Sequence, residues 1–198
     1  MVAGHTGDEA GARAALADAG PDIRAAGLAA LARMGALRVE DLAAALTDPA
    51  PAVRRRACDL AGRNGVTTLV APLVRSLSDG SSPVVEAACL ALGELGGPAA
   101  SGADTVATLA AVAGAHQDPL CREAAVASLG AIGAPDGLAA VLAALSDKPA
   151  VRRRAVVALA AFEGETVDQA LATAATDSDW QVRQVAEDLL GARPRLGH

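Results

Sequence analysis

The stretch DPAPAVRRRACDLAG, residues 48–62, returns almost intact as DKPAVRRRAVVALA at residues 147–160. Weaker copies begin near four other aspartates, so one apolar residue can be aligned in each of six segments. Successive aligned residues lie 30, 31, 37, 30 and 31 positions apart. A fixed period in this range is typical of a solenoid, in which each unit buries its apolar face against its neighbours. The six aligned residues, here called anchors, are Ile23, Val53, Val84, Cys121, Val151 and Val182.

Proline and glycine mark the two ends of one helix in most units. Proline stands two residues before four of the anchors, and it suits a first helical turn, where its missing N–H would have no partner anyway. Glycine stands twelve residues after four anchors and suits the left-handed position that ends a helix. Inside this second helix, apolar or small residues recur at the anchor and at four, five and eight residues beyond it, which places them on one side. In the fifth unit these residues are Val151, Ala155, Val156 and Leu159.

These patterns predict an all-α fold, an α-α superhelix of about six helical hairpins forming a single domain over residues 1–198. A loop insertion rich in Gly, Pro and Ser is expected at residues 97–102, and a short tail at residues 192–198. The six hairpins are expected at residues 8–35, 38–65, 67–97, 103–133, 135–163 and 165–191.

The residues around the anchors resemble HEAT repeats, in particular the short bacterial repeats of the phycobilisome-lyase HEAT-like type. The resemblance rests on an aspartate in the turn between helices, then Val-Arg, then Ala and Leu-Gly on the second helix. It covers residues 8–191, and the third unit departs from it with Val85 in place of the arginine. The aspartates and arginines that carry it are Asp18 and Arg24, Asp48 and Arg54, Asp118 and Arg122, Asp147 and Arg152, and Asp177 and Arg183.

The resemblance to HEAT repeats implies a curved superhelix with the first helices on its convex side and the second helices on its concave side. It also implies that the turn aspartates and the arginines form a ladder that links neighbouring turns. An arginine just inside a helix N-terminus opposes the helix dipole unless an acid lies nearby, so the five arginines are expected to be structural. The family mostly binds proteins, and few of its members are enzymes.

The composition limits the function classes. Hydrophobic residues make up 52% of the chain and aromatic residues 1%, so the core must consist of Ala, Leu and Val. The formal net charge is -6, which argues against general binding of nucleic acid or anionic membrane. The three cysteines cannot all pair and are expected to be small buried residues of a reduced, cytoplasmic protein. No apolar run is long enough for a membrane span, and residues 1–11 lack the features of a signal peptide.

Residues that could carry chemistry are scarce. His5, His116 and His198 lie far apart in the sequence, so neither a metal cluster nor a Cys–His pair is expected. The glycine-rich turn at residues 93–97 lacks the lysine of a phosphate-binding loop and follows a helix. Trp180 replaces the proline of other units and is expected to cover the last hairpin. We therefore predict no enzyme activity, no cofactor and no metal.

The positions two and six residues after each anchor point away from the buried side. They predict a partner-binding surface on the concave face, with an ordinary solvated face as the alternative. Their mixture of charged and apolar residues suits a protein or peptide better than a metabolite. The predicted contact residues are Arg55, Glu86, Leu90, Glu123, Arg153, Val157 and Gln184.

Two alternatives to a protein-binding scaffold remain open. One is an accessory factor of the phycobilin-lyase type that handles a chromophore or prosthetic group. The other is a HEAT-like nucleic-acid binder, which the acidic charge disfavours. The arginine runs at residues 54–56 and 152–154 are either solvated helix ends, docking points for an acidic partner, or separate anion sites.

Overall fold

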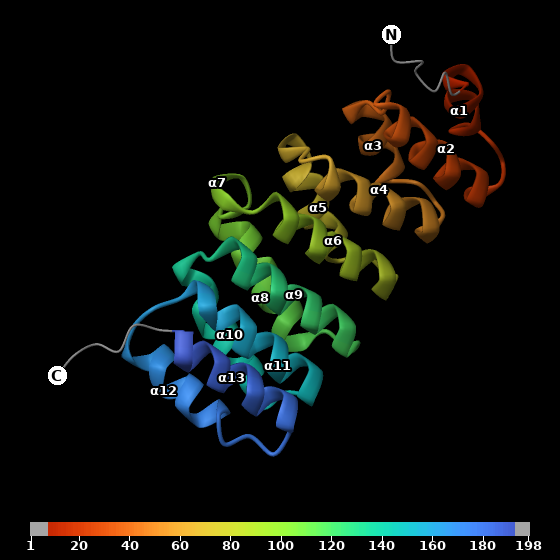
Figure 1. Ribbon diagram of the computed structural model, residues 1–198. Coiled ribbons are helices and arrows are strands. Elements are labelled where there is room, and N and C mark those ends of the chain that lie inside the picture. Colours follow the sequence, from red (N-terminus) through yellow and green to blue (C-terminus); the bar gives the residue numbers. More distant parts are fainter. Residues whose placement is uncertain (1–7, 193–198) are drawn as a thin grey trace, which may run out of the picture. The chain divides into compact units, whose positions relative to one another are not determined.

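The computed structural model describes residues 8–192, and these residues form only helices and connecting turns (Figure 1). The all-α prediction is therefore confirmed. The first part of the chain contains α1 (Glu9–Ala15), α2 (Pro21–Met34), α3 (Val39–Ala45), α4 (Pro51–Arg63), α5 (Val70–Ser76) and α6 (Ser82–Leu95). The second part contains α7 (Gly97–Ala100), α8 (Ala103–Ala115), α9 (Pro119–Ile132), α10 (Leu138–Ala143), α11 (Pro149–Ala158), α12 (Glu165–Ala174) and α13 (Trp180–Ala192).

The chain divides into two compact units, Met1–Leu95 and Gly96–His198, here called unit 1 and unit 2. In unit 1 the second helices α2, α4 and α6 pack successively on one another, and each also packs on its own first helix. In unit 2 the second helices α9, α11 and α13 do the same. Each unit is therefore a stack of three helical hairpins. The prediction of one domain over residues 1–198 stays a prediction.

The helix ends follow the predicted punctuation. Pro21, Pro51, Pro119 and Pro149 each lie in the first turn of a second helix. The glycines at Gly35, Gly65, Gly96 and Gly133 all have positive φ, between 49° and 69°. Glycine adopts this backbone conformation without the steric cost that a Cβ adds, so these residues end the helices and reverse the chain.

The buried side of the second helices is also confirmed. The four stripe residues predicted in the fifth hairpin are fully buried, and the five anchors from Val53 onward are at most 2% exposed. Small residues let the helices approach closely, because a Cβ at Gly62 would lie 2.8 Å from Ala91 Cα and one at Gly130 would lie 2.7 Å from Ala158 Cα. The anchor Ile23 differs, with 49% of its surface exposed. Among the described residues, α2 packs on the following second helix α4 and has no preceding second helix in unit 1.

Two predicted boundaries need correction. The loop insertion at residues 97–102 contains the one-turn helix α7, whose Ala100 is fully buried. Pro98 suits its first turn and the two alanines that follow favour helix, which explains why this short segment is not an open loop. The predicted tail begins too early, because α13 extends to Ala192. Residues 193–198 lie outside the described residues.

A ladder of ion pairs joins successive turns within each unit. In each rung the arginine Nε and Nη2 donate to the two carboxylate oxygens of the turn aspartate in the next hairpin. For Arg54 and Asp79 these N···O distances are 2.7 and 2.8 Å, and Arg54 Nη1 donates to the carbonyl of Asp48 in its own turn at 2.7 Å. The rungs are Arg24–Asp48 and Arg54–Asp79 in unit 1, and Arg122–Asp147 and Arg152–Asp177 in unit 2.

The rungs alter the acidity of their carboxyl groups. The arginine hydrogen bonds lower the pKa of all four rung aspartates below the ordinary value, because they favour the charged form. The expected ladder is thus present, with one correction to its pairing. Each arginine takes its carboxylate from the following turn, and its own turn supplies main-chain carbonyl oxygens. Arg183 consequently has no aspartate carboxylate within 4.0 Å among the described residues.

The cysteines are buried as expected. Cys58, Cys89 and Cys121 have no exposed surface. Burial raises the pKa of the Cys58 thiol to about 12. These residues therefore pack as small apolar groups, which is the interpretation that the sequence favours.

Candidate partner-binding faces and grooves

The predicted contact residues of unit 1 lie on two packed helices. Arg55 belongs to α4 and is exposed, while Glu86 and Leu90 lie one turn apart on α6. Leu90 is 45% exposed although its neighbours Cys89 and Ala91 are buried. The helix thus turns an apolar side chain outward between charged residues. Arg55, Glu86 and Leu90 are called the second-helix face of unit 1.

The matching residues of unit 2 lie on three packed helices. Arg153 and Val157 are one turn apart on α11, and Val157 is 44% exposed. Glu123 on α9 is half-buried and accepts a hydrogen bond from Arg154 Nη2 at 3.2 Å. Gln184 on α13 is exposed and donates to Asp188 at 2.9 Å. Glu123, Arg153, Val157 and Gln184 are called the second-helix face of unit 2.

Three features of unit 2 could not be read from its sequence. Arg153 Nη1 donates to Gln181 Oε1 at 2.9 Å, which links α11 to α13. Arg154 forms an ion pair with Glu123, whereas Arg153 has no carboxylate partner among the described residues. Trp180 is 64% exposed, so the expectation that it covers the last hairpin is wrong.

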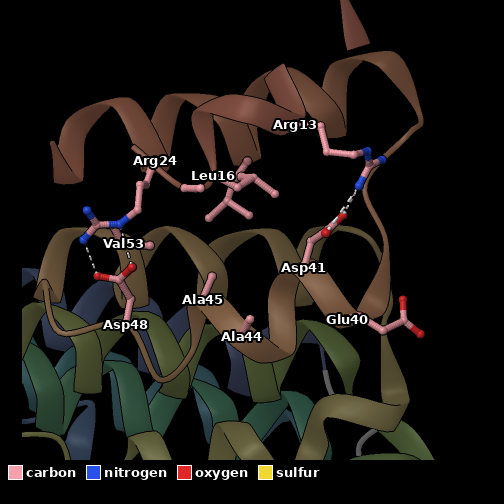
Figure 2. Close-up of a pocket in the computed structure, with 11 residues that line it drawn as sticks. Arg13, Leu16, Arg24, Glu40, Asp41, Ala44, Ala45, Asp48 and Val53 are labelled. Carbon is pink, nitrogen blue, oxygen red and sulfur yellow. Dashed lines mark hydrogen bonds and ion pairs between the residues drawn. The ribbon is translucent and has the colours of Figure 1, made fainter. Parts of the chain in front are cut away.

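A groove in unit 1 opens between the first two hairpins (Figure 2). Its volume is about 340 Å³, and its apolar lining includes Leu16, Leu28 and Val53. An ion pair stands at each end of the drawn groove: the rung of Arg24 and Asp48, and a second pair in which Arg13 Nη1 lies 3.0 Å from Asp41 Oδ2. The sequence pattern did not indicate this second pair, because Arg13 lies on a first helix outside the repeated motif.

A comparable groove in unit 2 lies between α10 and α12. Its volume is about 510 Å³, and its lining includes Leu142, Leu145, Thr166, Gln169 and Thr173. Both grooves thus lie between consecutive first helices, where the helices are less closely packed than the second helices. Neither groove involves the predicted contact residues.

The residues that could supply catalytic or metal chemistry do not converge. Within residues 8–192, no three His, Cys, Asp or Glu side chains are placed to hold a metal ion. His116 ends α8, where its Nδ1 accepts a hydrogen bond from the Asp118 main-chain N–H at 3.1 Å. His5 and His198 lie outside the described residues. Over the described part of the chain, no helix combines the length and the hydrophobicity that a membrane span requires.

Stacked helical hairpins with a repeated Asp–Arg ladder define an α-solenoid. The family model described as HEAT repeats matches residues 39–103 and 106–191. The chain therefore belongs to the HEAT-repeat family, as the sequence resemblance indicates.

Solved structures of similar fold include natural and engineered repeat proteins. A chain from the complex of CpcE and CpcF of phycocyanin lyase from Nostoc sp. PCC7120 is 24% identical, with a TM-score of 0.67 over 96% of this chain and 78% of that chain. A designed armadillo repeat protein in complex with the peptide (KR)4 is 17% identical, with a TM-score of 0.68 over 93% and 99%. An engineered protein is 17% identical, with a TM-score of 0.72 over 93% and 98%. At these identities the likeness shows the fold alone. No curated protein matches the sequence.

Proposed function

We propose that this chain is a non-enzymatic scaffold that binds a partner protein or peptide on the second-helix faces of its units. The observation that carries the proposal is the exposure of Leu90 in unit 1 and Val157 in unit 2 among residues of both charges. An apolar contact with a polar rim is the usual composition of a protein interface. The fully buried stripe beneath these residues holds the helices in place before binding, which reduces the entropy lost on association.

The solved structure of a designed armadillo repeat protein with the peptide (KR)4 supports this proposal by analogy, since it has the same general fold. In this chain the arginines of the faces, exposed Arg55 and partly exposed Arg153, favour a partner that offers carboxylates. Arg55 has no ion-pair partner among the described residues, and Arg153 is held only by the neutral Gln181. Each can therefore form a charge-assisted hydrogen bond with an incoming acid.

No observation favours the chromophore-handling alternative. The 340 Å³ groove of unit 1 has no aromatic residue among its lining side chains. Two of its acids, Asp41 and Asp48, are already paired with arginines, and Glu40 is the remaining acid. A pocket for a conjugated ring would be expected to offer aromatic contacts and an available acid. The net charge of -6 gives no support to nucleic-acid binding.

The proposal can be tested with peptides selected from a random display library on the unmodified protein. Charge reversal at Arg55 or at Arg153 should weaken the selected peptides at least tenfold, about 1.4 kcal/mol. The effect should shrink as salt rises, because exposed ion pairs are screened. Each substitution is made separately, so that each unit is judged on its own.

Arg75→Glu is the matched control, since Arg75 is an exposed arginine on the first helix α5 of unit 1. Isothermal titration should show peptide affinity unchanged by Arg75→Glu and reduced by Arg55→Glu or Arg153→Glu. Loss of binding in the Arg75 variant, with binding retained in both face variants, would place the site on the first-helix side.

A further inference from the structure

One half of a ladder rung stands unpaired on α13. Arg183 Nη1 donates to the main-chain carbonyls of Asp177 and Ser178 at 2.6 and 3.1 Å, as the other rung arginines do with their own turns. Within residues 8–192, however, its Nε and Nη2 have no carboxylate acceptor. The side chain is thus already oriented, with the edge that binds aspartate in every complete rung left open.

The complementary half stands unpaired before α2. Asp18 Oδ1 accepts the Gly20 main-chain N–H at 2.7 Å, just as Asp48 Oδ1 accepts the Ala50 N–H at 2.8 Å in a complete rung. No arginine of the described chain lies within 4.0 Å of the Asp18 carboxylate. The turn therefore presents its carboxylate in the geometry that the ladder uses, without the guanidinium.

Exposed apolar side chains accompany both halves. Trp180 lies three residues before Arg183, so the two occupy the same side of α13, and Trp180 is 64% exposed. Ile23 is 49% exposed, whereas the five other anchors are buried. A further hairpin placed against either side would cover one of these residues.

We propose that copies of this chain associate head to tail, with Arg183 of one copy binding Asp18 of the next. The Arg183 Nε and Nη2 would donate to the two Asp18 carboxylate oxygens, which repeats the bidentate geometry of the four rungs. A second copy is the occupant because the two halves have opposite charge and both belong to this chain. Such a heterologous contact gives a ring if the rotation closes and an open chain if it does not.

The contact is reversible and depends on concentration. Glu187 on α13 is exposed at the position that Val126 and Val156 fill in α9 and α11. Covering this carboxylate opposes the contact, because burial of an unpaired charge is unfavourable. The assembly is therefore expected to grow gradually with protein concentration.

Sedimentation velocity and the fluorescence of the single tryptophan test the proposal on the full chain. For the unmodified protein, the average mass should rise with concentration and the Trp180 emission should shift to shorter wavelength in parallel. Arg183→Glu and Asp18→Asn should each lower the association constant at least tenfold. Asn keeps an oxygen that can accept the Gly20 N–H, so the second variant retains the turn. Arg183→Gln replaces Arg183→Glu if the latter fails to fold.

A mixture of the two variants tests the direction of the contact. The Arg183→Glu chain retains Asp18, and the Asp18→Asn chain retains Arg183, so together they should form a one-to-one dimer that grows no further. Arg75→Glu should assemble like the unmodified protein. The proposal is overturned by a monomer at all concentrations, by undiminished assembly of either variant, or by a mixture that stays monomeric.

Discussion

The heptapeptide PAVRRRA occurs twice, at residues 51–57 in α4 of unit 1 and at residues 149–155 in α11 of unit 2. On the buried side the two copies are equivalent. Val53 and Val151 are at most 2% exposed, and the first arginine of each run makes a bidentate rung with the next turn aspartate. Identical residues thus have identical roles wherever the repeat supplies the partner.

On the exposed side the same heptapeptide has different partners. The last arginine of the α11 run, Arg154, bonds with Glu123 on the preceding second helix. The matching position before α4 is Ala25, and Arg56 has no carboxylate within 4.0 Å among the described residues. The comparison shows that the repeat motif determines the ladder, whereas the neighbouring helix determines what the outer arginines do.

The largest expected effect is the loss of a rung in either unit. Replacing Arg54 or Arg152 with Ala should destabilise the protein by about 1–3 kcal/mol, because a partly buried aspartate loses its charged donors. The two losses should be similar, since the two rungs have the same geometry within about 0.1 Å. Urea unfolding followed by circular dichroism measures both.

The control for the ladder variants is a substitution of the second of the three consecutive arginines in each heptapeptide. Arg55→Ala and Arg153→Ala remove side chains that make no rung, so each should cost less than about 0.5 kcal/mol. If substituting the first and the second arginine lowered the free energy of unfolding equally, the ladder would contribute little to stability.

A second prediction concerns acid. Because the folded-state pKa of Asp79 and Asp177 is lowered, the unfolded chain takes up protons first as the pH falls. The stability from these rungs is fully present above the unfolded-state pKa of about 3.9 and is lost as the pH falls through the folded-state value. Arg54→Ala and Arg152→Ala should therefore flatten the dependence of unfolding free energy on pH below about 5. A slope unchanged in both variants would contradict this assignment.

The features that the sequence predicted correctly are those that recur from one hairpin to the next. These local features are the Pro and Gly positions, the buried stripe, and the Asp and Arg residues of the ladder. Because they recur in most hairpins, one sequence contains several independent examples of each. It could not predict that each arginine pairs with the following turn, because that depends on the stacking direction.

Properties that depend on neighbouring helices were also beyond sequence reasoning. Ile23 is exposed because no described hairpin precedes the one formed by α1 and α2, although Ile23 occupies the same anchor position as in the other hairpins. The pairing of Arg154 with Glu123 and the grooves between first helices likewise arise from tertiary packing. At positions two and six, Leu90 and Val157 are exposed and Glu123 is half-buried, and exposure alone does not identify what binds them.

A third prediction removes the outer pair of unit 2. Glu123→Ala should destabilise the protein by about 0.5–1 kcal/mol, less than a rung, because Arg154 is partly exposed and its pair is screened by solvent. High salt should reduce the difference between the variant and the unmodified protein. An effect as large as that of Arg152→Ala would mean that the outer pair, rather than the ladder, holds α9 against α11.

The smallest expected effect comes from building the missing pair into unit 1. Ala25→Glu places an acid at the position that Glu123 occupies in unit 2, opposite Arg56. The new pair should show a coupling free energy of about 0.2–0.5 kcal/mol, as for exposed ion pairs. The single substitution cannot reveal it, because glutamate also has a lower helix propensity than alanine. A double-mutant cycle with Arg56→Ala separates the two effects, since only the pairing depends on both residues. Unfolding at low salt should give the coupling, and at 1 M salt it should disappear. Zero coupling at low salt would show that α2 and α4 hold these positions further apart than α9 and α11 do.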